Sequence, residues 1–295
     1  MPTPIRHDGA AAGFTARGRH FDVTTAPLLM GVLNATPDSF SDAGRYRTLA
    51  QRIDRGLELV SAGADIVDVG GESAITNRPS VAVDEEIDRV VPLIEGLVAR
   101  SPALVSVDTY KPAVAGAAIA AGAGIVNDTS GLRDPALADA CAASGAALVV
   151  MHTRAAPKRR LQDPDLYTDV VRDVVEFLRE RTELAQRLGV PRERLIVDPG
   201  PDFSKTPAQT IAVLRDLAPI ARLGYPLLLA ISRKDFVGAL VHKPPRARLA
   251  GTLAALDHGL TSGASIFRVH DVAEARAFIS ARLALRRNAV GAAGY

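Results

Sequence analysis

Short apolar runs recur along the chain, and amphipathic stretches separate them. Continuous apolar runs between turn signals are typical of parallel strands that are covered on both faces. We therefore expect strands over residues 28–33, 65–69, 103–107, 124–126, 146–151, 194–197, 226–231 and 265–269.

The stretches between these runs predict helices. Residues 49–60 place Leu49, Ile53, Leu57 and Val60 on one helical face, and residues 87–94 repeat the pattern. Six helical stretches end in a small or apolar residue followed by glycine, as in SAGAD (61–65) and TSGAS (261–265). A glycine just past the last periodic residue predicts a helix end and a short loop into the next strand.

Repeated strand–helix units predict a single (β/α)8 TIM barrel of the α/β class over residues 26–286. A doubly wound open sheet is the alternative, but the chain lacks a GxGxxG fingerprint and a second domain. Residues 1–25 contain arginines but no continuous apolar segment, so we expect a flexible extension there rather than a secretory signal. We expect residues 287–295 to form a flexible tail.

Composition narrows the choice of function. The formal net charge of +2 and the absence of tryptophan argue against a nucleic-acid surface. No apolar run reaches membrane-spanning length. Cys141 is the single cysteine, which excludes an internal disulfide and favours a reducing, cytoplasmic location. The one basic cluster, residues 154–160, is interpreted as a solvated loop or as an aid to the arrival of an anionic ligand.

Every predicted strand is followed by a polar residue. In a parallel barrel these carboxyl ends meet at one mouth, where active sites form. Any one of them alone could be a helix cap or a turn residue, and we expect Asp68 and Glu72 to be structural. Together they predict a site, formed by Asn34, Asp68 with Glu72, Asp108, Asn127, His152, Asp198, Ser232-Arg233-Lys234, and Arg268 with His270.

The chemistry of this ring falls into three parts. Asp108, Asn127 and Asp198 suit a flat nitrogen heterocycle that is rich in N–H donors. The cationic residues after the last two strands suit a phosphate or pyrophosphate. The first loop, NATPDSFSDAG, offers hard oxygen ligands that match Mg²⁺ held partly by a phosphate. These parts suggest a displacement with pyrophosphate as leaving group, since no Ser–His–Asp, Cys–His or zinc-binding spacing stands out.

Eight motifs, in order, resemble the dihydropteroate synthase family. They are MGVLNATPDSFSD, GADIVDVGGES, SVDT, GIVNDTSG, VVMH, LIVDPGPDF, ISRKDFVG and FRVHDV. The resemblance implies a (β/α)8 enzyme that joins 4-aminobenzoate to 6-hydroxymethyl-7,8-dihydropterin pyrophosphate. The products would be 7,8-dihydropteroate and pyrophosphate, formed with Mg²⁺ in folate biosynthesis. It also implies a homodimer.

The resemblance also assigns roles to residues of this chain. It implies that Asp108, Asn127, Asp198 and Lys234 hold the pterin, with Met151 against its ring. Arg268 and His270 would grip the pyrophosphate, and Ser232 and Phe203 would border the aminobenzoate. Asn34 would lie at the metal. The first loop would shelter a cationic intermediate with Asp38, Phe40 and Asp42. Lys234, Arg268 and these three loop residues form the implied catalytic set.

Two motifs depart from the family pattern. Ala74-Ile75-Thr76-Asn77 stands where the family has Thr-Arg-Pro-Gly, and Asp202 stands where the family has glycine. Lys205 could neutralise Asp202, or the loop could open differently. Two further interpretations therefore stay open. One is a paralogue that binds the pterin pyrophosphate but condenses poorly, and the other is a pterin-binding methyltransferase-type domain. The Arg268-x-His270 pair and the first loop argue against the latter.

Overall fold

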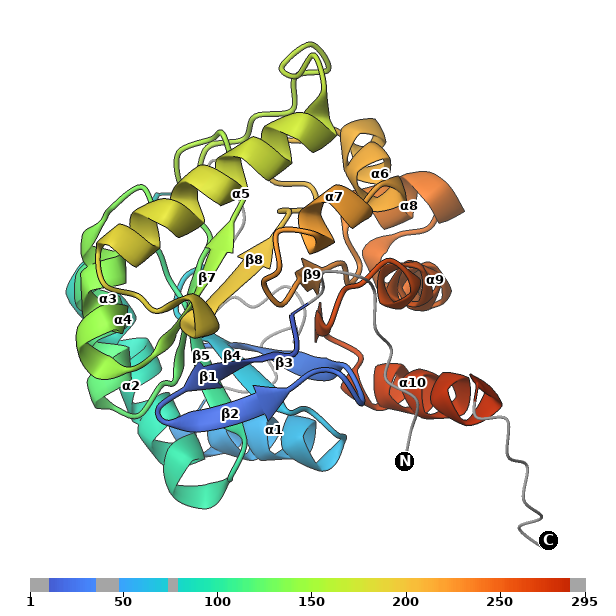
Figure 1. Cartoon of the computed structure of the whole chain (residues 1–295). Coiled ribbons are helices and arrows are strands. Elements are labelled where there is room, and N and C mark those ends of the chain that lie inside the picture. Colours follow the sequence, from blue (N-terminus) through green and yellow to red (C-terminus); the bar gives the residue numbers. More distant parts are fainter. Residues whose placement is uncertain (1–10, 36–47, 74–78, 287–295) are drawn as a thin grey trace, which may run out of the picture.

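The computed structural model describes residues 11–35, 48–73 and 79–286. Eight parallel strands form one sheet in the order β8-β7-β6-β5-β4-β3-β10-β9. The two end strands are joined by a parallel bridge between Val197 and Leu227, so the sheet closes into a barrel. Figure 1 shows the strands inside a ring of helices, which confirms the predicted barrel.

The barrel strands lie within one or two residues of the predicted runs. They are β3 (Leu28–Asn34), β4 (Ile66–Gly70), β5 (Leu104–Asp108), β6 (Ile125–Asp128), β7 (Ala147–Met151), β8 (Leu195–Asp198), β9 (Leu228–Ala230) and β10 (Ile266–Val269).

Helices follow each strand and cover the outside of the barrel. They are α1 (Leu49–Ser61), α2 (Val83–Arg100), α3 (Pro112–Ala120), α4 (Ala136–Ser144), α5 (Val170–Arg187), α6 (Pro207–Arg215), α7 (Ala218–Ala221), α8 (Asp235–Val241), α9 (Leu249–Thr261) and α10 (Val272–Arg286). Two short 3-10 turns, Arg192–Arg194 and Pro245–Ala247, precede β8 and α9. None of the helices in the described ranges has the length and apolar character needed to cross a membrane.

The predicted helix signals correspond to real helix ends and faces. Glycines 63, 122, 145, 189, 224 and 263, each in one of the six repeated phrases, all have positive φ. Helix α1 begins with a capping box in which the Thr48 hydroxyl accepts from the Gln51 backbone N–H at 3.2 Å. Ile53, Leu57 and Val60 pack against the core as predicted, whereas Leu49 is 44% exposed at the first turn.

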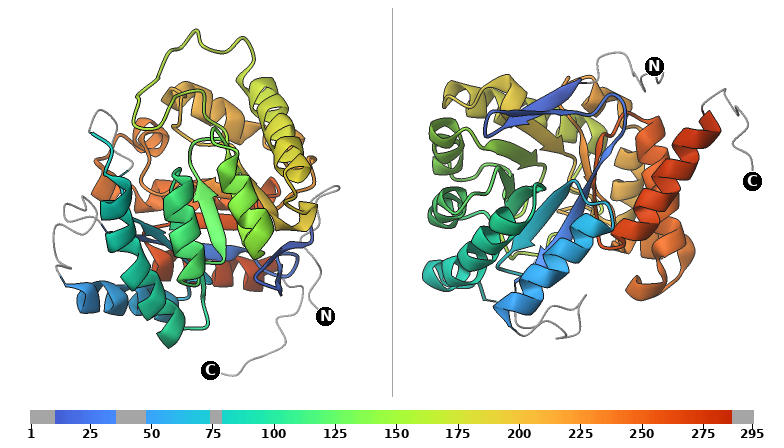
Figure 2. Two further views of the ribbon diagram at one scale, coloured as in Figure 1. Left: turned by 90° about the vertical axis from the view of Figure 1, so that its left-hand side faces the viewer. Right: turned by 90° about the horizontal axis from the view of Figure 1, so that it is seen from below.

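An antiparallel hairpin precedes the barrel, formed by β1 (Gly13–Ala16) and β2 (Arg19–Asp22). Phe14 is fully buried and joins the apolar cluster inside the barrel. The Arg17 backbone N–H donates to the Gly145 carbonyl at 2.8 Å, in a loop that leads into β7. The hairpin therefore closes the amino-terminal end of the barrel. It is the dark blue element at the upper edge of the right-hand view of Figure 2. The expected flexible extension is wrong for residues 13–22.

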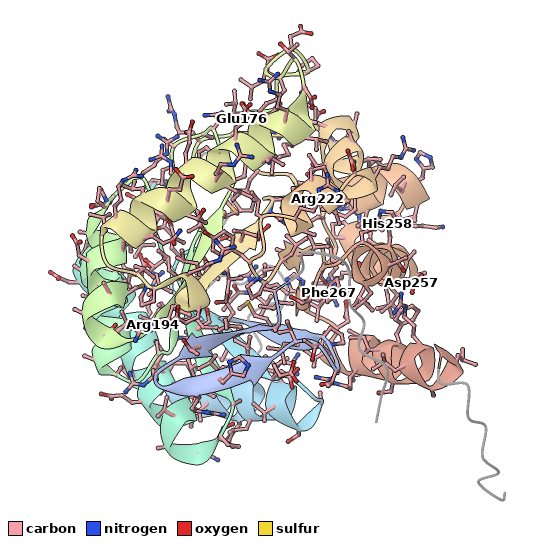
Figure 3. All side chains as sticks on the ribbon, viewed as in Figure 1. Glu176, Arg194, Arg222, Asp257, His258 and Phe267 are labelled. Carbon is pink, nitrogen blue, oxygen red and sulfur yellow. The ribbon has the colours of Figure 1, made fainter. Side chains whose placement is uncertain are left out.

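Two separate apolar layers result from the alternation of side chains along the strands. Phe267, Leu29, Val107 and Leu148 belong to the layer between strands and helices, and Phe267 lies well inside the molecule in Figure 3. Met30, Ile66, Leu104, Ile125, Ile196 and Ile266 belong to the layer inside the barrel. Charged residues such as Glu176 lie on the outer face of the helices (Figure 3).

Candidate active site

The alternation of side chains determines what reaches the barrel mouth. Alternate side chains of each strand point into the barrel. The inward side chain that follows an inward apolar residue, two positions later, is polar in most strands. Ile66 precedes Asp68, Ile125 precedes Asn127, and Ile196 precedes Asp198 in this way. The apolar layer thus excludes water from below, and the polar side chains above it form the floor of the mouth.

Strand register brings the predicted residues together. Asn34 pairs with Gly70, Gly70 with Asp108, and Asp108 with Asn127, so these positions occupy one level. On the neighbouring strands β7 and β8, Met151 pairs with Asp198. The predicted substrate-binding residues of β5 to β8 therefore lie around one mouth.

Arg268 is held by two carboxylates. Its Nε donates to Asp68 Oδ2 at 2.6 Å, and its Nη2 donates to Asp108 Oδ2 at 2.8 Å. The Asn127 amide also donates to Asp68 Oδ2, at 3.1 Å. Burial raises the pKa of Asp108 to about 7, although Arg268 opposes that shift. Burial disfavours the guanidinium charge, but Asp68 and Asp108 outweigh this and raise the pKa of Arg268.

Asp198 and Lys234 form the second charged part of the mouth. Asp198 Oδ1 accepts from the Gly200 backbone N–H at 2.7 Å, and burial raises the pKa of Asp198. Lys234 Nζ donates to the Pro201 carbonyl at 2.6 Å and lies 4.7 Å from the centre of the Phe203 ring. Burial lowers the pKa of Lys234. This lysine therefore lies where β8 and β9 end, beside Phe203, the residue predicted to border the aminobenzoate.

Ser232 and His270 contact each other beside Arg268. The Ser232 hydroxyl lies 3.0 Å from His270 Nδ1 and accepts from the His270 backbone N–H at 3.2 Å. Burial, reinforced by Arg268, lowers the pKa of His270 to about 4, so the ring is neutral near pH 7. Arg233 also lines the cavity at the mouth, but its charge is paired, since its Nε donates to Asp271 at 3.0 Å.

His152, which the sequence places in the ring, and Lys205, which it places beside Asp202, form a buried chain under the mouth. Lys205 is fully buried, and its Nζ lies 2.7 Å from His152 Nδ1 and donates to the carbonyls of Gly200 and Phe203, each at 3.1 Å. His152 Nε2 lies 2.9 Å from Asp173 Oδ1. Burial lowers the pKa of Lys205 to about 7 and that of His152 to about 4.

A hydroxyl links the same two loops. Ser204 Oγ accepts from the backbone N–H groups of Arg154 at 3.1 Å and Ala155 at 2.7 Å. Together with Lys205, this contact fixes the loop after β8 against the loop after β7. Phe203, which lies between Asp202 and Ser204, is positioned by these contacts. The lysine in DPGPDFSKT was the available sequence signal, but its partner His152 is 53 residues away.

The basic cluster is not simply solvated. Lys158 Nζ donates to the Ser73 carbonyl at 2.7 Å and lies 3.3 Å from Glu72 Oε1. Glu72 also accepts from Lys111 Nζ at 2.8 Å and from the Tyr110 hydroxyl at 3.1 Å. These bonds support the structural role expected for Glu72. They also bring the loop after β7 across the mouth, so the solvated-loop interpretation is wrong for Lys158.

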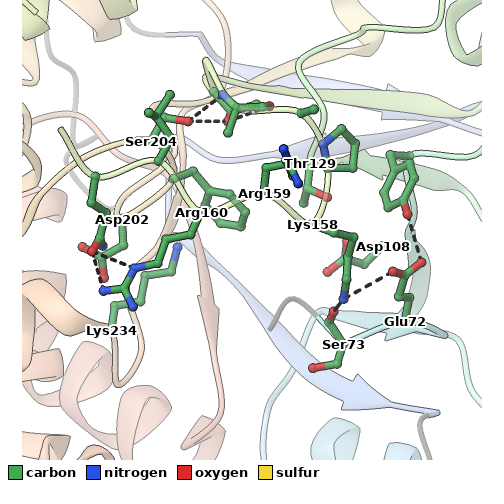
Figure 4. Close-up of a pocket in the computed structure, with 18 of the residues that line it drawn as sticks. Glu72, Ser73, Asp108, Thr129, Lys158, Arg159, Arg160, Asp202, Ser204 and Lys234 are labelled. Carbon is green, nitrogen blue, oxygen red and sulfur yellow. Dashed lines mark hydrogen bonds and ion pairs between the residues drawn. The ribbon is translucent and has the colours of Figure 1, made fainter. Parts of the chain in front are cut away.

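A cavity of about 530 Å³ lies among these loops. Its walls include the predicted residues Asp108, Phe203 and Lys234. Figure 4 shows Asp202 and Lys234 on one side of it, and Glu72 and Ser73 on the other, with Arg159 and Arg160 between them. A volume of this size fits a small organic substrate, and its charged walls can hold an anion.

Asp202 has a backbone conformation that glycine adopts easily, with φ of 63°. Its Oδ2 accepts from the backbone N–H groups of Asp235 at 2.7 Å and Phe236 at 3.3 Å, at the start of α8. Lys205 lies close enough to Asp202 for their charges to attract, but it does not bond to it, because its Nζ bonds to His152 and two carbonyls instead. The aspartate instead ties the loop after β8 to the helix that follows Lys234.

Some predicted site residues fall outside the described ranges. Asp38, Phe40 and Asp42 of the first loop and the departure at residues 74–77 lie there. Asn34 ends β3 at the level of Asp108, and its Oδ1 lies 3.9 Å from an ideal Cβ built on Gly70.

Comparisons with known proteins agree with this geometry. The profile of the family described as "Pterin binding enzyme" matches residues 30–270. The chain is 42% identical to dihydropteroate synthase of Bacillus subtilis (strain 168) over 83% of this chain and 84% of that protein. Identity to the Escherichia coli (strain K12) dihydropteroate synthase is 37%, over 92% and 97% of the two chains.

Solved structures extend the likeness to three dimensions. The Xanthomonas albilineans dihydropteroate synthase with 4-aminobenzoic acid superposes with a TM-score of 0.86 at 39% identity, covering 94% of this chain and 99% of that one. The same enzyme in complex with 7,8-dihydropteroate gives a TM-score of 0.83, covering 93% and 99%. The chain therefore belongs to the dihydropteroate synthase family of pterin-binding enzymes.

Proposed function

We propose that this protein condenses 6-hydroxymethyl-7,8-dihydropterin pyrophosphate with 4-aminobenzoate. The observation that carries the proposal is the set of acceptors at the mouth, Asp108, Asn127 and Asp198, beside the cations Arg268 and Lys234. A flat heterocycle rich in N–H groups would bond to the acceptors, with Met151 against its ring. The diphosphate would then lie against Arg268 and His270.

In the proposed reaction the amine nitrogen of 4-aminobenzoate forms a bond to the pterin methylene carbon. The bond from that carbon to the pyrophosphate oxygen breaks, the electron pair leaves with pyrophosphate, and the amine loses a proton. Arg268 would stabilise the leaving group, and the cation of Lys234 would lie beside the reacting groups. Ser232 and Phe203 would border the aminobenzoate, and Asp38, Phe40 and Asp42 would shelter the reacting carbon.

We include Mg²⁺ in the proposal. The described residues contain no cluster of three or more His, Cys, Asp or Glu side chains that could enclose a metal ion. The amide oxygen of Asn34 at the mouth could be one ligand of an ion that is otherwise held by phosphate oxygens and water, as Mg²⁺ usually is. When bound, the ion would neutralise charge on the leaving pyrophosphate.

Assembly and location are part of the same proposal. We infer a homodimer formed through outer helices, which light scattering of the purified protein would test. We also infer a cytoplasmic enzyme, because Cys141 is buried and unpaired and the substrates belong to folate biosynthesis. Fractionation of the host cells would test this. Nucleic acid and membrane partners are not part of the proposal.

The decisive assay measures pyrophosphate release from the dihydropterin pyrophosphate, with and without 4-aminobenzoate. Release that depends on aminobenzoate and yields 7,8-dihydropteroate supports the proposal. Binding or release without condensation would instead support the second candidate, the paralogue. The observation that favours the paralogue is Asp202, which brings a carboxylate to the wall of the cavity beside Phe203.

The charge of Asp202 leads to a prediction about the second substrate. Like charges about 8 Å apart in water repel by about 0.5 kcal/mol, and 4-aminobenzoate is an anion. In Asp202→Asn the amide oxygen can still cap α8, so the KM for 4-aminobenzoate should fall about twofold in steady-state assays. The difference should shrink at high salt. A higher KM in the variant would show that the negative charge helps the substrate to bind.

The pKa of Asp108 leads to a prediction about pH. Because this acid titrates at about 7 in the free protein, its carboxylate is available to pterin N–H groups only above that pH. Affinity for 6-hydroxymethyl-7,8-dihydropterin should therefore fall by up to about tenfold per pH unit below 7. Calorimetry between pH 5.5 and 8.5 would measure this. Asp108→Asn should bind the pterin weakly, and its affinity should depend less on pH. If the pH dependence is unchanged in this variant, the titrating group is another one, such as Lys205.

A further inference from the structure

The two acids that hold Arg268 differ in depth. Asp68 is fully buried, and its side chain has no exposed surface, whereas the Asp108 side chain is 19% exposed. Among the described residues that line the cavity, Asp108 is present and Asp68 is absent. The Nε group of the guanidinium is therefore anchored below the mouth, and the Nη2 group bonds a carboxylate that a ligand can reach.

Asp68 has features of a fixed anchor. Its Oδ2 accepts from both Arg268 and Asn127, and its Oδ1 is buried with no hydrogen-bond partner among the residues that the structure describes. A buried carboxylate in this state depends on the nearby guanidinium for compensation of its charge. It therefore keeps the Arg268 side chain at the mouth whatever the Nη2 group contacts.

Asp108 has the opposite character. In the free protein its Oδ2 is occupied by Arg268, yet the proposed function requires this carboxylate to accept N–H groups of the pterin. The same function requires Arg268 to bind the pyrophosphate. Each of the two recognition groups thus has one hydrogen-bonding atom occupied by the other, and a ligand that needs either atom competes with this ion pair.

We propose that Asp68 is a positioning residue that holds the Nε group of Arg268, while the Nη2 group exchanges its partner between Asp108 and the substrate's pyrophosphate. This inference rests on the proposed function. When the pterin bonds to Asp108, the Nη2 group of Arg268 becomes available to the pyrophosphate. When pyrophosphate bonds to Arg268, the Asp108 carboxylate becomes available to the pterin. The two halves of the substrate therefore favour each other's binding, by the same factor in both directions.

Calorimetry on the wild-type protein tests the coupling. Inorganic pyrophosphate and 6-hydroxymethyl-7,8-dihydropterin would each be titrated alone and in the presence of the other, at pH 8 with Mg²⁺ throughout. Each ligand should bind about tenfold more tightly when the other is present. Equal affinities with and without the second ligand would overturn the exchange. No binding of the pterin under any condition would overturn the proposed function, and this inference with it.

Three variants test the roles of the acids through pyrophosphate affinity alone. Asp108→Asn should bind inorganic pyrophosphate about tenfold more tightly, because the competing partner of Arg268 loses its charge. Asp198→Asn is the matched control, since Asp198 also carries a buried charge at the mouth but does not bond to Arg268. If both variants gain equally, net charge alone explains the effect and the exchange is wrong.

Asp68→Asn gives the opposite sign. Loss of one more negative charge would by itself strengthen anion binding, but loss of the anchor should weaken pyrophosphate about tenfold and remove the coupling to the pterin. A structural role alone would lower the melting temperature and leave the coupling factor unchanged. Tighter pyrophosphate binding in this variant, with the coupling retained, would overturn the role of Asp68. If Asp68→Asn does not fold, the comparison of Asp108→Asn with Asp198→Asn still decides the exchange.

Discussion

Asp198→Ala is expected to abolish pterin binding, with a loss of affinity of at least about a hundredfold. Asp198 is 2% exposed and is surrounded by the positive charges of Lys234, Lys205 and Arg268. In such a site its carboxylate would accept charge-assisted bonds from the pterin, each contributing about 1.5–3 kcal/mol. Calorimetry with 6-hydroxymethyl-7,8-dihydropterin would measure the loss.

The matched control is Asp198→Asn. The amide oxygen can still accept from the Gly200 backbone N–H, which the carboxylate bonds at 2.7 Å in the structure. The loop after β8 should then keep its conformation, while one recognition bond and the negative charge are lost. We expect intermediate affinity for this variant. Unchanged affinity in the alanine variant would contradict the placement of the pterin against β8.

Arg268→Ala is expected to lower the free energy of unfolding by about 3 kcal/mol at pH 8. The change leaves Asp68 and Asp108 buried without the cation that both contact, and breaking a buried ion pair on one side costs about 3–5 kcal/mol. At pH 6 the loss should be smaller, because Asp108, whose pKa is about 7 beside Arg268, is already largely protonated in the unsubstituted protein and loses less when the arginine is removed. Urea unfolding at the two pH values would measure both numbers.

A double variant separates charge from packing. Asp68→Asn combined with Arg268→Ala should recover part of the stability, since one of the two uncompensated carboxylates is removed. If the double variant is less stable than Arg268→Ala, the arginine contributes mainly through packing of its side chain. In binding assays, Arg268→Ala should weaken inorganic pyrophosphate more than a pterin without a diphosphate. Equal losses would remove the arginine's assigned role.

The barrel itself was largely predictable from local pattern. Each apolar run became a strand to within one or two residues, and the glycines that end the repeated phrases have positive φ. Parallel strands covered on both faces must be continuously apolar, and a helix must end where the backbone turns left-handed. These constraints act over a few residues, so a local sequence is enough to reveal them.

The hairpin over residues 13–22 was missed for a physical reason. Its strands are four residues long, and their alternation is broken by Arg17-Gly18 at the turn. Two such strands are marginal alone, and here Phe14 and Ala16 are buried only because the barrel end receives them. The glycine of Arg17-Gly18, between two short alternating segments, was the one signal in the sequence, and both residues have positive φ in the structure.

The sequence alone was enough to predict most of the described residues that gather at the mouth, although His152 is buried beneath it. Strand order and a period of two place Asn34, Asp108, Asn127, Asp198 and Arg268 at the carboxyl ends, because alternate side chains of a strand share one face. The pairing of charges could not be read in this way. Arg268 bonds to Asp68, which is 200 residues away in the sequence. Lys205 bonds to His152 rather than to Asp202, which is nearer to it in the sequence. Which acid meets which cation depends on register, barrel closure and loop geometry, and these exist only in the folded chain.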